Sequence, residues 1–222
     1  KHFEEKVQAI VSEEQIGGNV YNGAKLITEP SDPFVTEELV NKIMSNLKGK
    51  SSYGFDNIPM RVLRDGVKYL ARPYYVLMKK ICNENQIPQQ WKTARVIPLF
   101  KKGEKTDVTN YRPISNLCAG SKILEKLILQ RLTDIEEKNG VELTGKNQHG
   151  FKKGHSTTTA CQEILARVSE AMDKGEYAVM ASLDLTAAFD VVNVELLLKR
   201  MEIMGIPQNL INILNFCAFS IE

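Results

Sequence analysis

The sequence predicts a helix-rich protein of the α+β class, with α/β as the alternative. Apolar residues recur at helical spacing in several long segments. Two shorter runs, at 94–100 and within 174–185, are rich in β-branched and other apolar residues and are too short for helices. The composition is that of an ordinary globular protein, with 43% hydrophobic and 25% charged residues among 222. This length is sufficient for one large domain or two small ones.

The chain divides into a lead-in and a domain. Residues 1–35 show weak periodicity and a turn signal at 17–19, and are interpreted as a linker with a short helix. Residues 36–222 are predicted to form the domain itself. Its first helix is expected to begin with Thr36 as the N-cap and to end at Gly49. The apolar face of this helix comprises Leu39, Val40, Ile43, Met44 and Leu47.

A helical region and a pair of short strands are predicted next. The helical region extends from about residue 60 to residue 85, and Pro73 is expected to kink or divide it. The run at 94–100 indicates a short edge strand, because Pro98 cannot donate a ladder hydrogen bond. A turn connects this strand to a second extended segment at 110–117.

Three helices and a buried strand are predicted in the second half. Ser121 begins an amphipathic helix, and a glycine-containing loop at 148–160 leads into another. The nearly continuous apolar run within 174–185 predicts a strand buried on both faces. A helix at 191–203 follows, with Asp190 as its N-cap or first residue. The three apolar helix faces are Ile123, Leu124, Leu127, Ile128, Leu132 and Ile135; Ile164, Leu165, Val168 and Met172; and Leu196, Leu197, Leu198 and Met201.

Basic residues are concentrated in the middle of the chain. The formal net charge is only +2, but the segment from Trp91 to Arg131 holds nine basic and three acidic residues, a surplus of six. Such a local excess indicates a site for a polyanion. A solvated loop with scattered lysines is the alternative interpretation.

The cysteines and the hydropathy exclude several classes of protein. The four cysteines (Cys82, Cys118, Cys161 and Cys217) form no C-x-x-C pair and fit no zinc framework, which favours reduced thiols in an intracellular protein. No run approaches the roughly 18 apolar residues that a membrane span needs. The chain lacks an initiator methionine and ends within an apolar run, so we expect it to be a piece of a longer protein.

Six motifs occur in an order that is typical of one family. They are GFDNIP (54–59), IPQQWKTARVIPLFKKG (87–103), NYRPISNL (110–117), KILEKLI (122–128), QHGFKKGHSTTTA (148–160) and SLDLTAAFD (182–190). Together they resemble the reverse transcriptases of non-LTR (LINE-like) retrotransposons, and group II intron reverse transcriptases share the general pattern. The resemblance runs from about residue 36 to the end of the chain.

This resemblance implies an RNA-directed DNA polymerase with a right-hand fold. The sequence is similar to the fingers and the first part of the palm, whereas the thumb and the palm motif with paired aspartates are missing from it. We therefore expect this chain alone not to extend a primer. The partners implied for the complete enzyme are an RNA template, a DNA primer and a dNTP, with no membrane and with a nuclear location for the parent element. The alternative function is a catalytically dead or domesticated remnant that binds nucleic acid.

The resemblance also implies a metal site at the end of the predicted buried strand. Asp184 corresponds to the first catalytic aspartate, and the backbone carbonyl of Leu185 would be a further ligand. The complete enzyme would hold two Mg²⁺ ions, with Mn²⁺ as an alternative. The other interpretation of Asp184 is that it caps the following turn. Asp190 is not assigned to the metal.

Three side chains are implied in binding the incoming nucleotide. Phe189 would lie under the sugar and reject a 2′-hydroxyl, and a core aromatic residue is the alternative interpretation. Lys101 and Arg112 would contact the triphosphate, because arginine can hold phosphate through two parallel hydrogen bonds. Lys102 is the alternative to Lys101, and solvated turn charges are the other interpretation of the lysines and of Arg112.

Template contacts are implied for the glycine-containing loop. Its lysines would contact phosphates, which carry no sequence information. The residues implied are Gln148, Phe151, Lys152, Lys153 and Gly154. His149 and His155 are interpreted as surface residues rather than metal ligands, because no carboxylate or cysteine completes a site in the sequence nearby.

Overall fold

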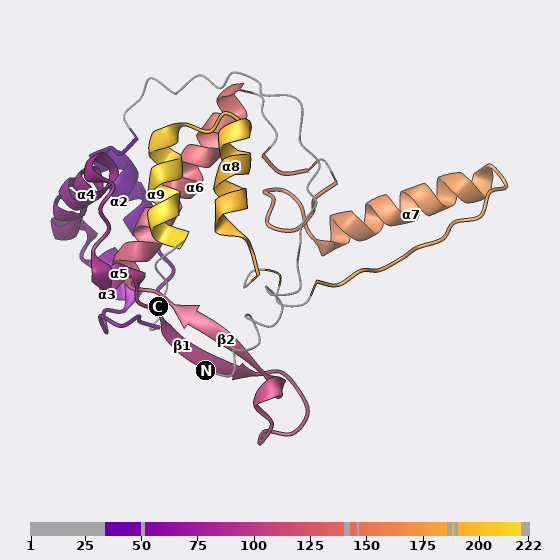
Figure 1. Ribbon diagram of the computed structural model, residues 1–222, viewed down its shortest axis with the longest axis horizontal. Coiled ribbons are helices and arrows are strands. Elements are labelled where there is room, and N and C mark those ends of the chain that lie inside the picture. The colour runs from indigo at the N-terminus through magenta and orange to yellow at the C-terminus, as the bar shows by residue number, and fades with distance from the viewer. Residues whose placement is uncertain are drawn as a thin grey trace.

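The computed structural model describes residues 34–49, 52–139, 143–145, 147–185, 188 and 191–218. Figure 1 shows a body of packed helices from which a β hairpin and one long helix project. The elements are α2 (Glu37–Ser45), α3 (Met60–Asp65), α4 (Val67–Glu84), α5 (Gln89–Lys92), β1 (Arg95–Phe100), β2 (Tyr111–Asn116), α6 (Ala119–Asn139), α7 (Thr157–Asp173), α8 (Val194–Ile203) and α9 (Gln208–Ala218). Helices with a small two-stranded sheet are compatible with the predicted α+β class.

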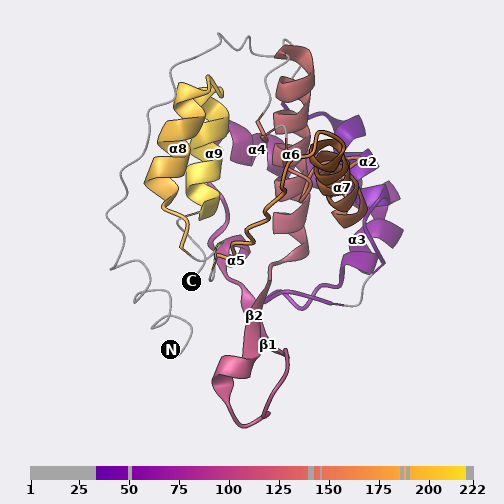
Figure 2. The same ribbon diagram turned by 90° about the vertical axis from the view of Figure 1, so that its right-hand side faces the viewer.

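One apolar cluster holds the helical body together. It joins α6 to α2, α4 and α9, and these three helices lie around α6 in both views (Figures 1 and 2). The faces predicted for the first helix and for the helix after Ser121 both enter this cluster, so those two predictions are confirmed. Its fully buried side chains are Val40, Met44, Met78, Ile81, Ile123, Leu124, Leu127, Ile135, Leu210 and Ile213.

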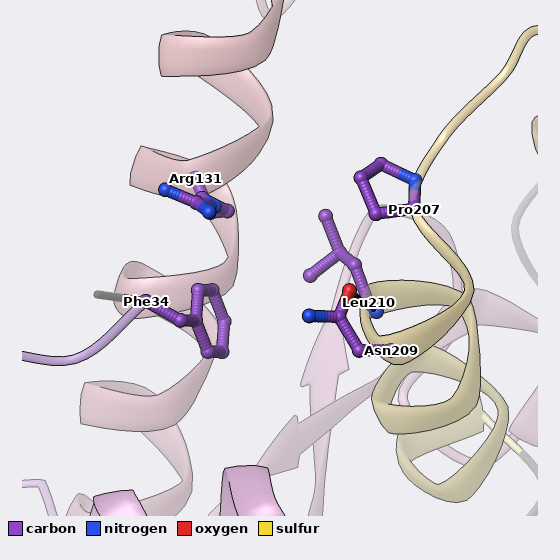
Figure 3. A pocket seen from close by; sticks show the side chains of 5 residues that line it. All are labelled: Phe34, Arg131, Pro207, Asn209 and Leu210. Atoms are coloured by element: carbon purple, nitrogen blue, oxygen red, sulfur yellow. Dashed lines mark hydrogen bonds between the residues drawn. The ribbon is translucent and has the colours of Figure 1, made fainter. Parts of the chain in front are cut away.

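An arginine is also buried in the helical body. Arg131 of α6 is only 9% exposed, and its guanidinium lies 5.8 Å from the ring centroid of Phe34. Figure 3 shows Asn209 and Leu210, from the start of α9, facing this pair across a shallow hollow. Stacking on an aromatic ring partly offsets the cost of removing a cation from water.

Two helix boundaries differ from those predicted. Thr36 caps α2 as expected, since the Leu39 N–H donates to Thr36 Oγ1 over 3.1 Å. The helix ends at Ser45 rather than Gly49, with Asn46 as its C-cap, and both the backbone N–H and the side chain of Asn46 donate to the Lys42 carbonyl. The break in the next helical region falls at Gly66, and Pro73 lies inside α4.

The predicted strand pair is confirmed as the antiparallel hairpin of β1 and β2. The Lys101 N–H donates to the Asn110 carbonyl over 2.8 Å, so residues 101 and 110 stand at the position of a hydrogen-bonded pair, although the Asn110 N–H donates to the Asp107 carbonyl instead of completing it. Such pairs alternate with non-hydrogen-bonded ones along an antiparallel ladder. Pro98 and Pro113 face each other three positions further along the strands, in a non-hydrogen-bonded pair. Neither proline therefore removes a bond from the ladder.

The strand predicted within 174–185 is wrong. Residues 176–185 have no regular secondary structure and run back from the tip of α7 toward the body (Figure 1). Val179 and Leu183 are 94% and 92% exposed. A strand needs a neighbour for its backbone hydrogen bonds, and none of the described segments pairs with this one. The apolar face of α7 is exposed in the same way, because this helix buries none of its residues.

The predicted helix start at Asp190 is also wrong. The helix α8 begins at Val194, and the Leu196 N–H donates to the side chain of its N-cap, Asn193, over 2.9 Å. Asp190 itself lies outside the described residues. All four cysteines are free thiols. In the part of the chain that the structure describes, no helix has the length and apolar character of a membrane span.

Candidate functional site

Trp91 fixes the base of the β hairpin to the helical body. It lies in α5, immediately before β1, and its ring stacks on Tyr74 with centroids 6.5 Å apart and an interplanar angle of 13°. The Ser121 hydroxyl of α6 donates to the Trp91 carbonyl over 2.7 Å. The indole also covers Gly120 so closely that a β-carbon at position 120 would lie 2.2 Å from Cζ2 of Trp91. Only glycine permits this approach.

The GFDNIP segment packs against the connection between β2 and α6. A β-carbon at Gly54 would lie 2.5 Å from the backbone nitrogen of Cys118. The Cys118 side chain donates to the Gln90 carbonyl over 3.3 Å, and burial raises the pKa of its thiol. The GFDNIP segment and the segment that holds Gln90 and Trp91 therefore meet around Cys118, at the base of the hairpin.

The hairpin register places Lys101 and Arg112 on one face. Residues that face each other across a ladder share a face, as do alternate residues along a strand. Arg112 is opposite Leu99, and Lys101 lies two positions beyond Leu99 and opposite Asn110. Both basic side chains are exposed, and Arg95 lies further along the same face. The register thus places Lys101 and Arg112 on the same face of the hairpin.

The opposite face and the turn are well braced. Phe100 and Tyr111 meet edge to face with centroids 5.4 Å apart, and the Tyr111 hydroxyl donates to the Lys105 carbonyl over 2.8 Å. In the turn, Asp107 accepts a 2.8 Å hydrogen bond from the Thr109 N–H, and Gly103 has a φ of 91°. These contacts order the backbone of the turn that carries Lys101 and Lys102.

A second group of the predicted residues lies on loop 147–155, which precedes α7. The loop has two residues with left-handed φ, Phe151 at 58° and Gly154 at 77°. Within the loop, Gln148 Nε2 donates to the Gly150 carbonyl over 3.0 Å, and Lys152 Nζ donates to the carbonyl of Gly145, which precedes the loop, over 3.5 Å. Phe151 is 94% exposed, and Lys153 is also exposed.

His149 is not the surface residue that the sequence suggested. Its side chain is only 17% exposed. Nε2 lies 2.8 Å from Glu163 Oε2, and Nδ1 lies 2.8 Å from Thr159 Oγ1. Hydrogen bonds from His149, first, and from Arg167 hold the pKa of Glu163 below its ordinary value. The only local signal for this network is the four-residue spacing of Glu163 and Arg167 on one helix face.

Asp184 lies on a separate segment from both of these groups. Its side chain is exposed in the extended segment that follows α7, and Leu185 beside it is 78% exposed. Phe189 lies outside the described residues. Among the residues that the structure does describe, no three His, Cys, Asp or Glu side chains are grouped so that they could hold a metal ion.

Residues 100–220 match the family model described as reverse transcriptase (RNA-dependent DNA polymerase). The chain belongs to the reverse transcriptase family. Among its relatives in Drosophila melanogaster, the RNA-directed DNA polymerase from mobile element jockey is 36% identical over 163 residues, which cover 71% of this chain and 17% of the relative. The probable RNA-directed DNA polymerase from transposon BS is 33% identical over 168 residues, covering 73% and 18%. The one from transposon X-element is 30% identical over 191 residues, covering 84% and 20%.

These relatives confirm the predicted kinship with retrotransposon reverse transcriptases. The chain spans about a fifth of the length of the curated relatives that it matches. Reverse transcriptases generally use divalent metal ions. The Asp184 carboxylate and the Leu185 carbonyl are oxygen donors of the kind that Mg²⁺ prefers, so they fit two ligand positions of such a site.

Proposed function

We propose that this chain forms the fingers and the first part of the palm of a retrotransposon RNA-directed DNA polymerase. The complete enzyme would add dNTPs to the 3′-hydroxyl of a DNA primer on an RNA template. The observation that carries this proposal is the hairpin register, which puts Lys101 and Arg112 on one exposed face. Membership of the reverse transcriptase family supports the reaction.

The hairpin face is proposed to bind the triphosphate of the dNTP. Arg112 would form two parallel hydrogen bonds with phosphate oxygens, and Lys101 would supply a compact positive charge next to it. The face alternation favours Lys101 over Lys102 as the partner of Arg112, because Lys101 continues the ladder through its bond to Asn110. The braced turn would keep both side chains directed at one ligand.

The 182–190 motif is proposed to supply the metal site and the sugar selection. Asp184 and the Leu185 carbonyl would hold a divalent ion, Mg²⁺ or Mn²⁺, which when bound neutralises phosphate charge and makes the 3′-hydroxyl more acidic. Phe189 follows Asp184 by five residues and would exclude a ribose 2′-hydroxyl. Asp184 is exposed on an extended segment, which leaves its carboxylate accessible to an ion and to further ligands.

Loop 147–155 is proposed to contact the RNA template. Lys152 and Lys153 would bind phosphates, and the exposed ring of Phe151 can stack on a base. Gln148 and Gly154 would complete the contact surface. These contacts would be independent of sequence, as a polymerase template site requires.

Nucleotide binding tests the proposal without requiring polymerase activity. Fluorescently labelled dNTP is titrated with the 222-residue chain and with three alanine variants, and anisotropy is recorded. Arg112→Ala and Lys101→Ala should each weaken binding by about tenfold, since a hydrogen bond to a charged group contributes about 1.5 kcal/mol or more. Lys102→Ala removes the same charge one residue away and is the matched control. Equal losses in all three variants would show diffuse attraction and would contradict the proposed triphosphate site.

A further inference from the structure

Loop 147–155 is joined to α7 by a network centred on His149. The imidazole lies between Thr159 in the first turn of α7 and Glu163 one turn later. Glu163 is in turn held by Arg167, whose Nη2 lies 2.5 Å from Oε1. A loop residue thus contacts two residues of the helix, the farther of which is 14 positions away in the sequence.

Both ring nitrogens of His149 are engaged in either protonation state. An ionised carboxylate only accepts hydrogen bonds, so Nε2 donates to Glu163. The Thr159 hydroxyl can accept from Nδ1 while donating to the Ser156 carbonyl 2.8 Å away, or it can turn and donate to Nδ1. The Ser156 carbonyl keeps a hydrogen bond in either orientation of the Thr159 hydroxyl, because it also accepts from the Ala160 N–H. The Thr159 hydroxyl and the Glu163 carboxylate therefore satisfy both ring nitrogens.

The network fixes the orientation of the loop relative to the axis of α7, which the hydrogen bonds within the loop do not determine. Those bonds, such as Gln148 Nε2 to the Gly150 carbonyl and His155 N to the Lys152 carbonyl, lie within the loop and set its shape. The bonds of His149 relate that shape to the axis of α7. Lys152 and Lys153 follow His149 by three and four residues, so their orientation depends on where its ring is held.

We propose that His149 and Glu163 form a clamp that positions Lys152 and Lys153 for the phosphates of RNA, an inference that rests on the proposed template-binding role of the loop. Glu163 is a positioning residue in this scheme, and it touches no RNA. The negative charge of Glu163 makes the two explanations predict opposite changes in RNA affinity when Glu163 is removed. A carboxylate near an RNA surface repels phosphate, so removing it should tighten binding if charge were its only effect. Removing a clamp should weaken binding.

The experiment compares four variants of the full 222-residue chain. Glu163→Ala and His149→Ala break the clamp, whereas Glu163→Gln keeps an oxygen that can accept from Nε2. Glu170→Ala is the charge-matched control, since Glu170 lies on the same helix and pairs with Lys174 instead. These sites lie in or against α7, which buries none of its residues, so the helical core should fold in each variant. Equal far-UV circular dichroism is the check.

Two readouts separate the clamp from the proposed function. The first is the initial rate of trypsin cleavage after Lys152 and Lys153, measured by mass spectrometry. It should rise about two- to fivefold in Glu163→Ala and His149→Ala, the range that a partly exposed polar side-chain pair supplies, and stay unchanged in Glu163→Gln and Glu170→Ala. The second is the affinity for labelled single-stranded RNA at 0.1 M salt. It should fall by a similar factor in the two clamp variants, because only the clamped fraction presents both lysines.

The RNA readout needs a reference for complete loss of the contacts. The double variant Lys152→Ala/Lys153→Ala should weaken RNA binding by about 25-fold if both lysines contact phosphate, since each contact contributes about fivefold at this salt concentration. Its dependence on salt should flatten by one to two units on a log–log plot.

The outcomes are distinguishable. If cleavage rises in the clamp variants but the unmodified chain does not bind RNA, the clamp is upheld and the proposed template-binding role fails. If cleavage is the same in all variants, or if Glu163→Ala tightens RNA binding as Glu170→Ala does, the clamp is overturned. Weaker RNA binding in Glu163→Gln equal to that in Glu163→Ala would also overturn it, because the retained acceptor should restore the contact.

Discussion

Replacing Gly120 by alanine tests how the hairpin is anchored. The new β-carbon would lie 2.2, 2.5 and 2.8 Å from Cζ2, Cε2 and Cη2 of Trp91. Carbon atoms pack at about 3.5 to 4.0 Å, so the indole would have to move by about 1.3 Å or more. This movement would disturb the stack on Tyr74 and the hydrogen bond from Ser121 to the Trp91 carbonyl.

Two opposing effects set the size of the change. Adding a methyl group to a packed site costs about 1 to 3 kcal/mol. Alanine in place of glycine within a helix gains at most about 1 kcal/mol. The 2.2 Å approach to Cζ2 places the steric cost in the upper part of its range, so we expect Gly120→Ala to lower the free energy of unfolding by about 1 to 2 kcal/mol.

Urea denaturation followed by circular dichroism measures this change, and a double-mutant cycle assigns it. In a Trp91→Leu background the atoms that clash are gone, so Gly120→Ala should become neutral or stabilise by up to about 1 kcal/mol. Gly150→Ala is the control, because no atom lies within 4 Å of a β-carbon there. Additive effects of the two substitutions would falsify the claim that Trp91 and Gly120 are directly packed.

Two further predictions concern titration. Burial raises the pKa of the Cys82 thiol to about 12 and that of the Cys217 thiol to about 11. At pH 8 a thiol reagent should therefore modify exposed Cys161 first, and it should react with Cys82 and Cys217 only as the pH approaches their pKa values. Rapid modification of all three at pH 8 would contradict this. The pKa of Glu163 is held below its ordinary 4.5, chiefly by His149, so the clamp should contribute fully above pH 4.5 and be lost as the pH falls through the lowered pKa. The ¹³C chemical shift of the Glu163 carboxyl should report a titration midpoint below 4.5 that rises in His149→Ala. An unmoved midpoint would exclude His149 as the cause.

Local patterns predicted those parts of the fold whose stabilising partners are specified locally. Thr36 caps its helix with a group three residues away, and the spacing of Ile123, Leu124 and Leu127 determines which side of α6 is buried. The run within 174–185 shows where such reasoning fails. An apolar sequence indicates that burial would be favourable, but a strand also requires neighbours, and no property of residues 176–185 specifies them.

The candidate site was predictable to a similar extent. The basic character around Lys101 and Arg112 is evident from the sequence, whereas their shared face follows from a register that the length of the turn does not determine. The contact between His149 and Glu163 could not be predicted from the residue types, because a histidine in a polar loop is compatible with many environments. Phe189 lies outside the described residues, so its proposed role stays a prediction.

The facing pair Pro98 and Pro113 has a consequence for how the protein behaves at high concentration. In the non-hydrogen-bonded pair, each N–H would point away from the partner strand, toward the outer edge of the hairpin. Each outer edge therefore lacks a donor at its middle, where a strand from a second molecule would pair. The hairpin projects into solvent with Val96, Ile97 and Leu99 exposed, a composition that favours sheet extension and aggregation. The two prolines make such self-association unfavourable while leaving both faces of the hairpin open to ligands.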